Sequence, residues 1–131
     1  MEQKPHPWFI TGFCARAGNF TFSRTGFKGV NLYLLIRFNN NEKQLAVLLA
    51  DYFEAGKLYF TNSAIYYRAT KMLDLEKVIA HFEKYPLQGE KNNIYQAWKG
   101  IFFLKKKNYR RKRWGTDNLT ELSSLLKKMS A

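Results

Sequence analysis

The chain has 131 residues and a formal charge of +12, from 22 Lys and Arg against 10 Asp and Glu. A hydrophobic content of 46% predicts a folded core and excludes a disordered chain, and no run approaches the roughly eighteen apolar residues of a membrane span. The charge favours a polyanionic partner, and a membrane partner is not expected. Since no linker or repeat interrupts the sequence, residues 1–131 are expected to form one nucleic-acid-binding domain, with Cys14 in its core.

Hydrophobic periodicity and turn residues predict nine elements in the order α-β-β-α-β-β-α-α-α. In that order, their predicted ranges are 8–18, 19–24, 30–38, 39–56, 57–61, 64–69, 71–85, 91–106 and 116–129. Gly56 is expected to end the second helix and Pro86 the third. Two hairpins separated by a helix predict an α+β fold, with an antiparallel four-stranded sheet backed by helices.

Alternation along the predicted strands divides their side chains between two faces. The inward set is expected to be Leu32, Leu34, Ile36, Leu58, Phe60, Ile65 and Tyr67. The outward set contains no acidic residue and comprises Thr21, Ser23, Tyr33, Arg37, Lys57, Tyr59, Thr61, Tyr66 and Arg68. Such a face is either an ordinary solvated surface or a nucleic-acid interface, and its composition favours the second.

Residues 7–18, PWFITGFCARAG, resemble the LAGLIDADG motif of homing endonucleases and maturases. Further along, YFEAGKLYF and YRATKMLDLEKVIAHFEKYPL resemble the strand–strand–helix block of the same family in both order and spacing. The resemblance extends from about Pro7 to Lys106. It implies the α-β-β-α-β-β-α core of that family and a sheet face that binds nucleic acid.

The resemblance also locates a departure from the family pattern. In the family, an acidic residue at the end of the motif helix holds the divalent metal that cleaves DNA, and the two acidic positions here are Ala15 and Ala17. An alanine methyl group offers no oxygen to a hard cation. The family often places a lysine shortly after the Pro-Leu pair, where this chain has Glu90 and then Lys91. We therefore expect no catalytic residue, no metal, no cofactor and no enzyme activity.

Gly12 and Arg16 lie four residues apart, on one helical face. The resemblance implies that this face pairs with the same helix of a second domain or subunit. An arginine buried there against its own symmetry copy would be costly, which disfavours a homodimer. The alternative is that Arg16 reaches the rim of the interface and pairing survives.

A basic segment, residues 105–113, follows the predicted fourth helix, and seven of its nine residues are Lys or Arg. With the aromatic residue that follows it, its candidate binding residues are Lys105, Lys106, Lys107, Tyr109, Arg110, Arg111, Lys112, Arg113 and Trp114. A phosphate backbone relieves the repulsion among such charges, and the aromatic rings suit stacking on unpaired bases. A solvated helix end or a nuclear localisation signal would give a similar pattern.

These features predict a catalytically inactive LAGLIDADG-like protein that binds structured RNA, as a structural subunit of a mitochondrial ribosome among neighbouring ribonucleoprotein subunits. Ribosomal RNA is favoured over intron RNA. Two alternatives remain open at this point. The first is a group I intron maturase, and the second is one half of a dimeric DNA homing endonuclease.

Overall fold

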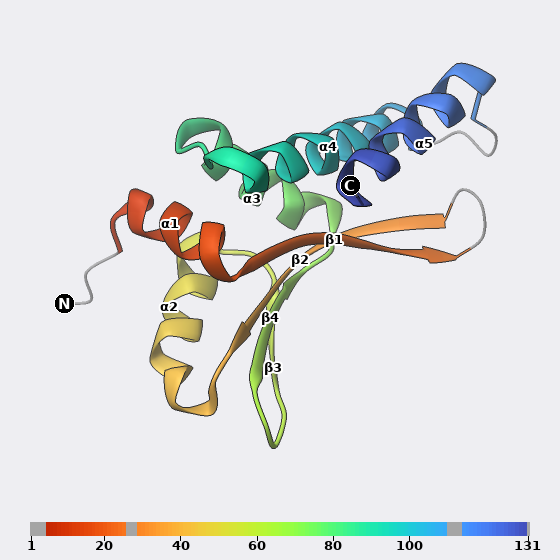
Figure 1. The fold of residues 1–131 in the computed structure, drawn as a ribbon. Coiled ribbons are helices and arrows are strands. Elements are labelled where there is room, and N and C mark those ends of the chain that lie inside the picture. Colours follow the sequence, from red (N-terminus) through yellow and green to blue (C-terminus); the bar gives the residue numbers. More distant parts are fainter. Residues whose placement is uncertain (1–4, 26–28, 110–113, 131) are drawn as a thin grey trace.

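The computed structural model describes residues 5–25, 29–109 and 114–130 (Figure 1). In chain order the elements are α1 (Pro7–Ala17), β1 (Gly18–Thr25), β2 (Gly29–Phe38), a 3-10 turn (Asn40–Glu42), α2 (Lys43–Phe53), β3 (Lys57–Phe60), β4 (Ile65–Ala69), α3 (Met72–Lys84), α4 (Gly89–Lys107) and α5 (Thr116–Ser130). The predicted order of helices and strands is confirmed, and the fold class is α+β as expected. No helix in the described part of the chain is long and apolar enough to cross a membrane.

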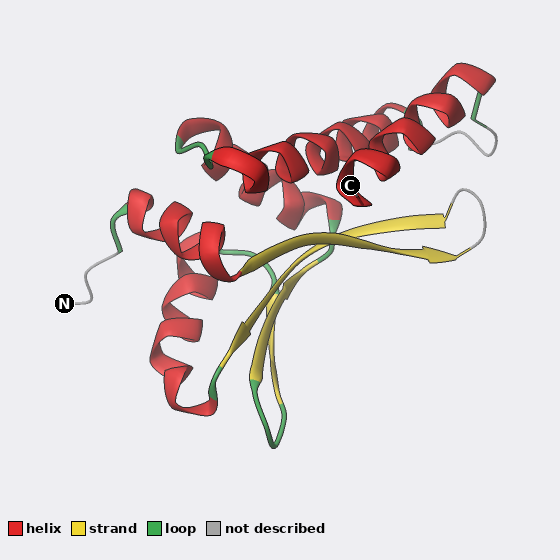
Figure 2. Ribbon diagram, viewed as in Figure 1, coloured by secondary structure: helices red, strands yellow, loops and turns green. Residues whose placement is uncertain are grey.

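The four strands form one antiparallel sheet in the order β1-β2-β4-β3. β2 is the long central strand, and the inward side chains Val30, Leu32, Leu34, Ile36 and Phe38 are all buried. The helices gather on the side and top of the curved sheet in Figure 2, and its lower right face carries no helix. One sheet face therefore forms the core, and the other is left open.

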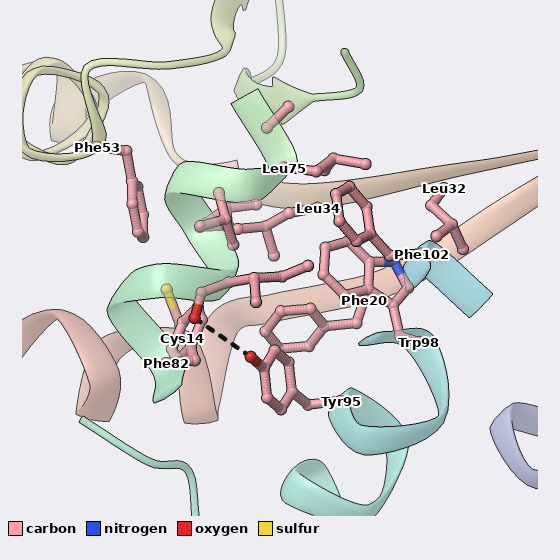
Figure 3. Close-up of a cluster of buried hydrophobic side chains, with 14 of the residues drawn as sticks. Cys14, Phe20, Leu32, Leu34, Phe53, Leu75, Phe82, Tyr95, Trp98 and Phe102 are labelled. Carbon is pink, nitrogen blue, oxygen red and sulfur yellow. Dashed lines mark hydrogen bonds between the residues drawn. The ribbon is translucent and has the colours of Figure 1, made fainter. Parts of the chain in front are cut away.

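Aromatic rings fill the centre of the core, where α4 crosses β1 (Figure 3). Phe20 of β1 lies with its ring centroid 5.1 to 5.4 Å from those of Phe82, Tyr95 and Trp98. The indole nitrogen of Trp98 donates a hydrogen bond to the Thr21 carbonyl at 3.1 Å, which satisfies the one polar group of this ring. These contacts fix α4 across the edge of the sheet formed by β1.

A buried polar cluster ties α1 to α2 and α3. Thr11 Oγ1 donates to the Tyr85 carbonyl at 2.8 Å and lies 2.9 Å from His81 Nε2. Since the Thr11 hydroxyl proton is already used, His81 Nε2–H donates to Thr11, and His81 Nδ1 accepts from the Tyr52 hydroxyl at 2.8 Å. Burial lowers the pKa of His81 to about 4, so the ring is neutral near pH 7.

Cys14 is fully buried on the inner face of α1, as expected. Burial raises the pKa of its thiol to about 12, which leaves no thiolate for nucleophilic chemistry near neutral pH.

Two local predictions are wrong. Phe60 has 59% of its surface exposed, although alternation points it inward. The β3–β4 hairpin extends past the end of α2 (Figure 1), and Lys43 lies over the ring there, with its Nζ 5.8 Å from the ring centroid. The second helix ends at Phe53 rather than at Gly56, because Glu54 takes the left-handed conformation with φ 52°.

Gly56 has a different structural role from the predicted one. Its φ is +83°, and a Cβ atom there would lie 2.7 Å from the ring of Tyr67. The residue therefore has to be glycine to let the chain pass over Tyr67 on its way into β3.

Candidate nucleic-acid interface

The open sheet face is built from rows of side chains that cross β2, β4 and β3. Strand pairing places Arg68 between Leu35 and Lys57, and the next row runs from Arg37 through Tyr66 to Tyr59. Because side chains alternate along a strand, these two rows point to the same, helix-free side of the sheet. The fold thus brings residues of three separate strands together on one face.

Arg68 is held in place on this face by Tyr33. The guanidinium carbon lies 4.5 Å from the centroid of the Tyr33 ring, which is cation–π geometry. The contact restricts the arginine before any ligand arrives, and it covers one face of the ring. A shallow hollow surrounds the pair and is lined by Ser23, Asn31, Tyr33, Tyr59, Arg68 and Thr70. Asn31 and Thr70 were not among the predicted residues, although alternation with Tyr33 marks Asn31 as outward.

The charge of the open face is positive. None of the four strands contains Asp or Glu, and the residues that point to the open face include Arg37, Lys57 and Arg68. Among the described residues, Arg37, Lys57 and Arg68 have no ion-pair partner, since the two ion pairs found there involve Lys99 and Lys106. Cations without acidic partners attract phosphates most strongly, because no neighbouring carboxylate competes for them.

Thr61 and Thr21, also predicted for this interface, are engaged in the fold. The Thr61 hydroxyl closes the β3–β4 turn, because it donates to the Ala64 carbonyl at 2.9 Å and accepts from the Ala64 amide at 3.0 Å. Thr21 is half-buried, with its carbonyl bound to Trp98. Ser23 is exposed on β1.

The basic segment is divided by the fold. Lys105 is half-buried, and its ammonium donates to the Val30 carbonyl at the start of β2. Burial lowers the pKa of Lys105. Lys106 forms an ion pair with Glu76 of α3 at 2.7 Å. Both side chains are therefore engaged by other parts of the chain, Lys105 half-buried and Lys106 in an ion pair at the surface.

The rest of the segment is placed differently. Lys107 and Tyr109 are exposed, Tyr109 with 76% of its surface. Trp114 is half-buried against the core. Arg110, Arg111, Lys112 and Arg113 lie outside the described residues. The contact of Lys105 with Val30 joins the start of this segment to the hairpin end of the sheet.

The C-terminal end of α1 carries no side chain that fits a divalent cation. Ala15 and Arg16 are exposed, and Ala17 is half-buried. Lys91 of α4 reaches this end, where its Nζ donates to the Gly18 carbonyl at 2.5 Å. The family site calls for carboxylate oxygens here, and this chain supplies methyl groups and cations instead. Sequence reasoning noted Lys91 only as a change in spacing, and its position beside Gly18 became visible only in the fold.

The exposed face of α1 is apolar over most of its length. Trp8 and Phe9 are 50% and 48% exposed, and Gly12 has nothing within 4 Å of where a Cβ would lie. Gly12 and Arg16 share this face, as predicted, with Arg16 at its C-terminal end.

Comparison with known proteins identifies the class to which this fold and site correspond. The sequence profile of the LAGLIDADG endonuclease family matches residues 10–102, so the chain belongs to this family. The resemblance seen in the sequence is thereby confirmed.

Individual relatives agree with the family assignment. An uncharacterized 50.9 kDa protein in ND4 intron 1 of Podospora anserina is 28% identical over 113 residues. Among solved structures, the homing endonuclease I-GzeII in complex with its DNA target is 26% identical, with a TM-score of 0.81 over 92% of this chain. The meganuclease I-AabMI bound to uncleaved DNA is 27% identical, with a TM-score of 0.82 over 92% of the chain. The homing endonuclease I-TnaI shares the fold, with a TM-score of 0.83 at 21% identity over 98% of the chain.

The matched proteins differ in length from this chain. It spans 25% of the Podospora protein and 43% of both I-GzeII and I-AabMI, but 90% of I-TnaI. The chain thus corresponds to somewhat less than half of I-GzeII and I-AabMI.

Proposed function

We propose that this chain binds structured RNA through the open sheet face and does not cleave nucleic acid. The observation that carries the proposal is the composition of the α1 end. Where the family requires metal-binding carboxylates, the chain has Ala15 and Ala17, and Arg16 and Lys91 add positive charge. At the same time the sheet keeps a cationic, acid-free face. Such a protein would bind nucleic acid without cleaving it.

The choice of RNA rests on the aromatic side chains among the cations. Tyr33, Tyr59 and Tyr66 lie on the open face, and Tyr109 is exposed in the basic segment. Aromatic rings beside cations suit unpaired bases, which structured RNA offers in loops and bulges and regular duplex DNA does not.

Within this proposal the favoured role is a structural RNA-binding subunit of a mitochondrial ribosome. A second role, a group I intron maturase, has its own support, because the Podospora relative lies in an intron of ND4. The same relative supports a mitochondrial setting. A third role competes with this proposal. The chain would then be the half of a dimeric DNA endonuclease that lacks the motif carboxylates, and it would require a partner chain with an intact acidic motif.

The loss of cleavage is tested with purified protein, plasmid DNA and RNA transcripts in Mg²⁺ or Mn²⁺. We expect no metal-dependent product from the native chain. We also expect none from Ala17→Asp, because one carboxylate beside Arg16 and Lys91 does not rebuild a metal site. Metal-dependent nicking by the native chain that is lost in Lys57→Ala/Arg68→Ala would contradict the proposal.

A further inference from the structure

A second hollow is lined by residues of β1, β2, α4 and α5. In Figure 1 the C-terminal end of α5 lies near the edge strand β1. The volume of the hollow is about 430 Å³, within the roughly 300–1,000 Å³ of small-ligand pockets. Its walls include Asn19, Thr21, Tyr33, Lys91, Ile94 and Met129. The hollow has no role in the metal chemistry of the family, and apart from Leu35 it is distinct from the two rows of side chains described on the sheet face.

One side of this hollow is polar and cationic. Lys91 is half-buried and fixed by its hydrogen bond to the Gly18 carbonyl, and within the described parts of the chain it forms no ion pair. An ammonium group has three N–H donors, so two remain for a ligand. Asn19, Thr21 and Tyr33 add amide and hydroxyl groups, and no acidic residue lines the hollow. This side suits a phosphate and the sugar beside it.

The other side is apolar. Leu35, Ile94 and Met129 are half-buried, so each leaves some apolar surface open to the hollow. A methionine thioether is polarisable and adapts to a planar ring, and an aliphatic side chain covers the face of a base. Tyr33 lines both this hollow and the one around Arg68. A group bound here would therefore be continuous with a chain lying on the sheet.

We propose that this hollow binds one unstacked nucleotide of the RNA held on the sheet, with its phosphate at Lys91 and its base against Ile94 and Met129. The inference rests on the proposed RNA-binding function and adds the class of ligand group that this part of the surface selects. Bulged or looped nucleotides meet the requirement, because their bases are already out of the helical stack.

The test compares two RNA hairpins with the same stem, one fully paired and one with a single bulged 2-aminopurine. We expect the native chain to bind the bulged hairpin about fivefold more tightly or better, since a stacked base contributes that much or more. Lys91→Gln should lower the affinity for the bulged hairpin more than for the paired one and bring the ratio close to one. Lys84→Gln is the matched control, because it removes one charge from an exposed position on α3. This control should leave the ratio unchanged.

A second variant guards against a fold defect in Lys91→Gln. Met129→Glu keeps Lys91 and puts a negative charge into the hollow, so it should also abolish the preference for the bulge. Thermal unfolding by circular dichroism checks that both variants remain folded.

The outcomes separate this inference from the proposed function. If the native chain binds both hairpins equally, or if Lys91→Gln and Lys84→Gln change the ratio alike, the nucleotide hollow is wrong while RNA binding stands. If neither hairpin binds, both proposals are wrong. Adenosine monophosphate serves as the free-nucleotide probe. If it binds as tightly as the bulged hairpin and Lys91→Gln abolishes that binding, the occupant is a free nucleotide and the inference of an RNA-derived one is overturned.

Discussion

The cations of the sheet face and those of the helical layer have different surroundings. On the helices, Lys99 pairs with Glu83 at 2.8 Å, Lys106 pairs with Glu76 at 2.7 Å, and Lys105 donates to a backbone carbonyl. On the sheet, Arg37 and Lys57 have no acidic neighbour on any strand. A net charge of +12 does not distinguish the two groups. The fold does so, because every Asp and Glu lies outside the strands.

The comparison predicts its largest effect for the sheet face. Changing Arg37, Lys57 and Arg68 together to Ala should weaken RNA binding by about 100-fold or more, at roughly 1 kcal/mol or more for each cation. The melting temperature should change little, since none of the three is buried. Fluorescence anisotropy measures the binding. Lys84→Ala/Lys127→Ala/Lys128→Ala is the matched control, and an equal loss there would show that only net charge matters.

The buried cluster around His81 predicts a pH effect on stability. Its pKa lies near 4 in the folded protein, against an ordinary value of 6.5. Between these pH values His81 is protonated in the unfolded chain but stays neutral in the folded chain. The free energy of unfolding therefore decreases as the pH falls from about 6.5 to 4. The full loss should be roughly 3 kcal/mol, at about 1.4 kcal/mol for each unit of pKa difference.

Urea unfolding at several pH values measures this loss in the free energy of unfolding. His81→Gln keeps an amide for hydrogen bonding but does not titrate, so its stability should fall less than that of the native chain over the same interval. A native stability that stays constant from pH 6.5 to 4.5 would contradict a buried neutral His81.

Lys105 and Lys107 offer a narrower test, because they are two residues apart with opposite predicted roles. Lys105→Met should lower the free energy of unfolding by about 1 kcal/mol, since the Val30 carbonyl loses its donor. Lys107→Met should leave the free energy of unfolding unchanged and reduce RNA affinity slightly. Equal destabilisation by both variants would mean that the Lys105 contact is unimportant for folding.

The smallest effect is expected for the exposed pair between α3 and α4. Hydrogen bonding to Lys99 lowers the pKa of Glu83, but the pair lies at the surface. Lys99→Met should therefore lower the free energy of unfolding by about 0.5 kcal/mol or less. RNA affinity should stay within twofold in a filter-binding assay, and a larger loss would extend the interface onto the helices.

The sequence was sufficient to predict the order of elements and the inward side of β2, because both follow from local periodicity. It also predicted the burial of Cys14, because a single cysteine has no disulfide partner. It could not predict the exposure of Phe60. Alternation gives the direction of a side chain, whereas burial depends on how far α2 extends over the sheet. The engagement of Lys105 was missed for a similar reason. A run of cations in sequence does not show which ammonium group lies beside a free carbonyl of a distant strand.

The candidate site was predictable in its residue types but not in its contacts. The outward set followed from alternation, and the losses at Ala15 and Ala17 followed from alignment with the motif. The stacking of Arg68 on Tyr33 and the approach of Lys91 to Gly18 join residues 35 and 73 positions apart in the chain, and only the fold brings them together.

The central claim is that the open sheet face holds RNA without cutting it. Ultraviolet cross-linking in the native source, followed by sequencing of the attached nucleic acid and mapping of the cross-linked peptides, tests this most directly. The account predicts intact RNA, ribosomal or from one intron, cross-linked at Tyr59 and Tyr66 on the sheet. Recovery of DNA from a single locus, together with a second chain that has an acidic motif, would contradict it and make this chain half of a DNA endonuclease.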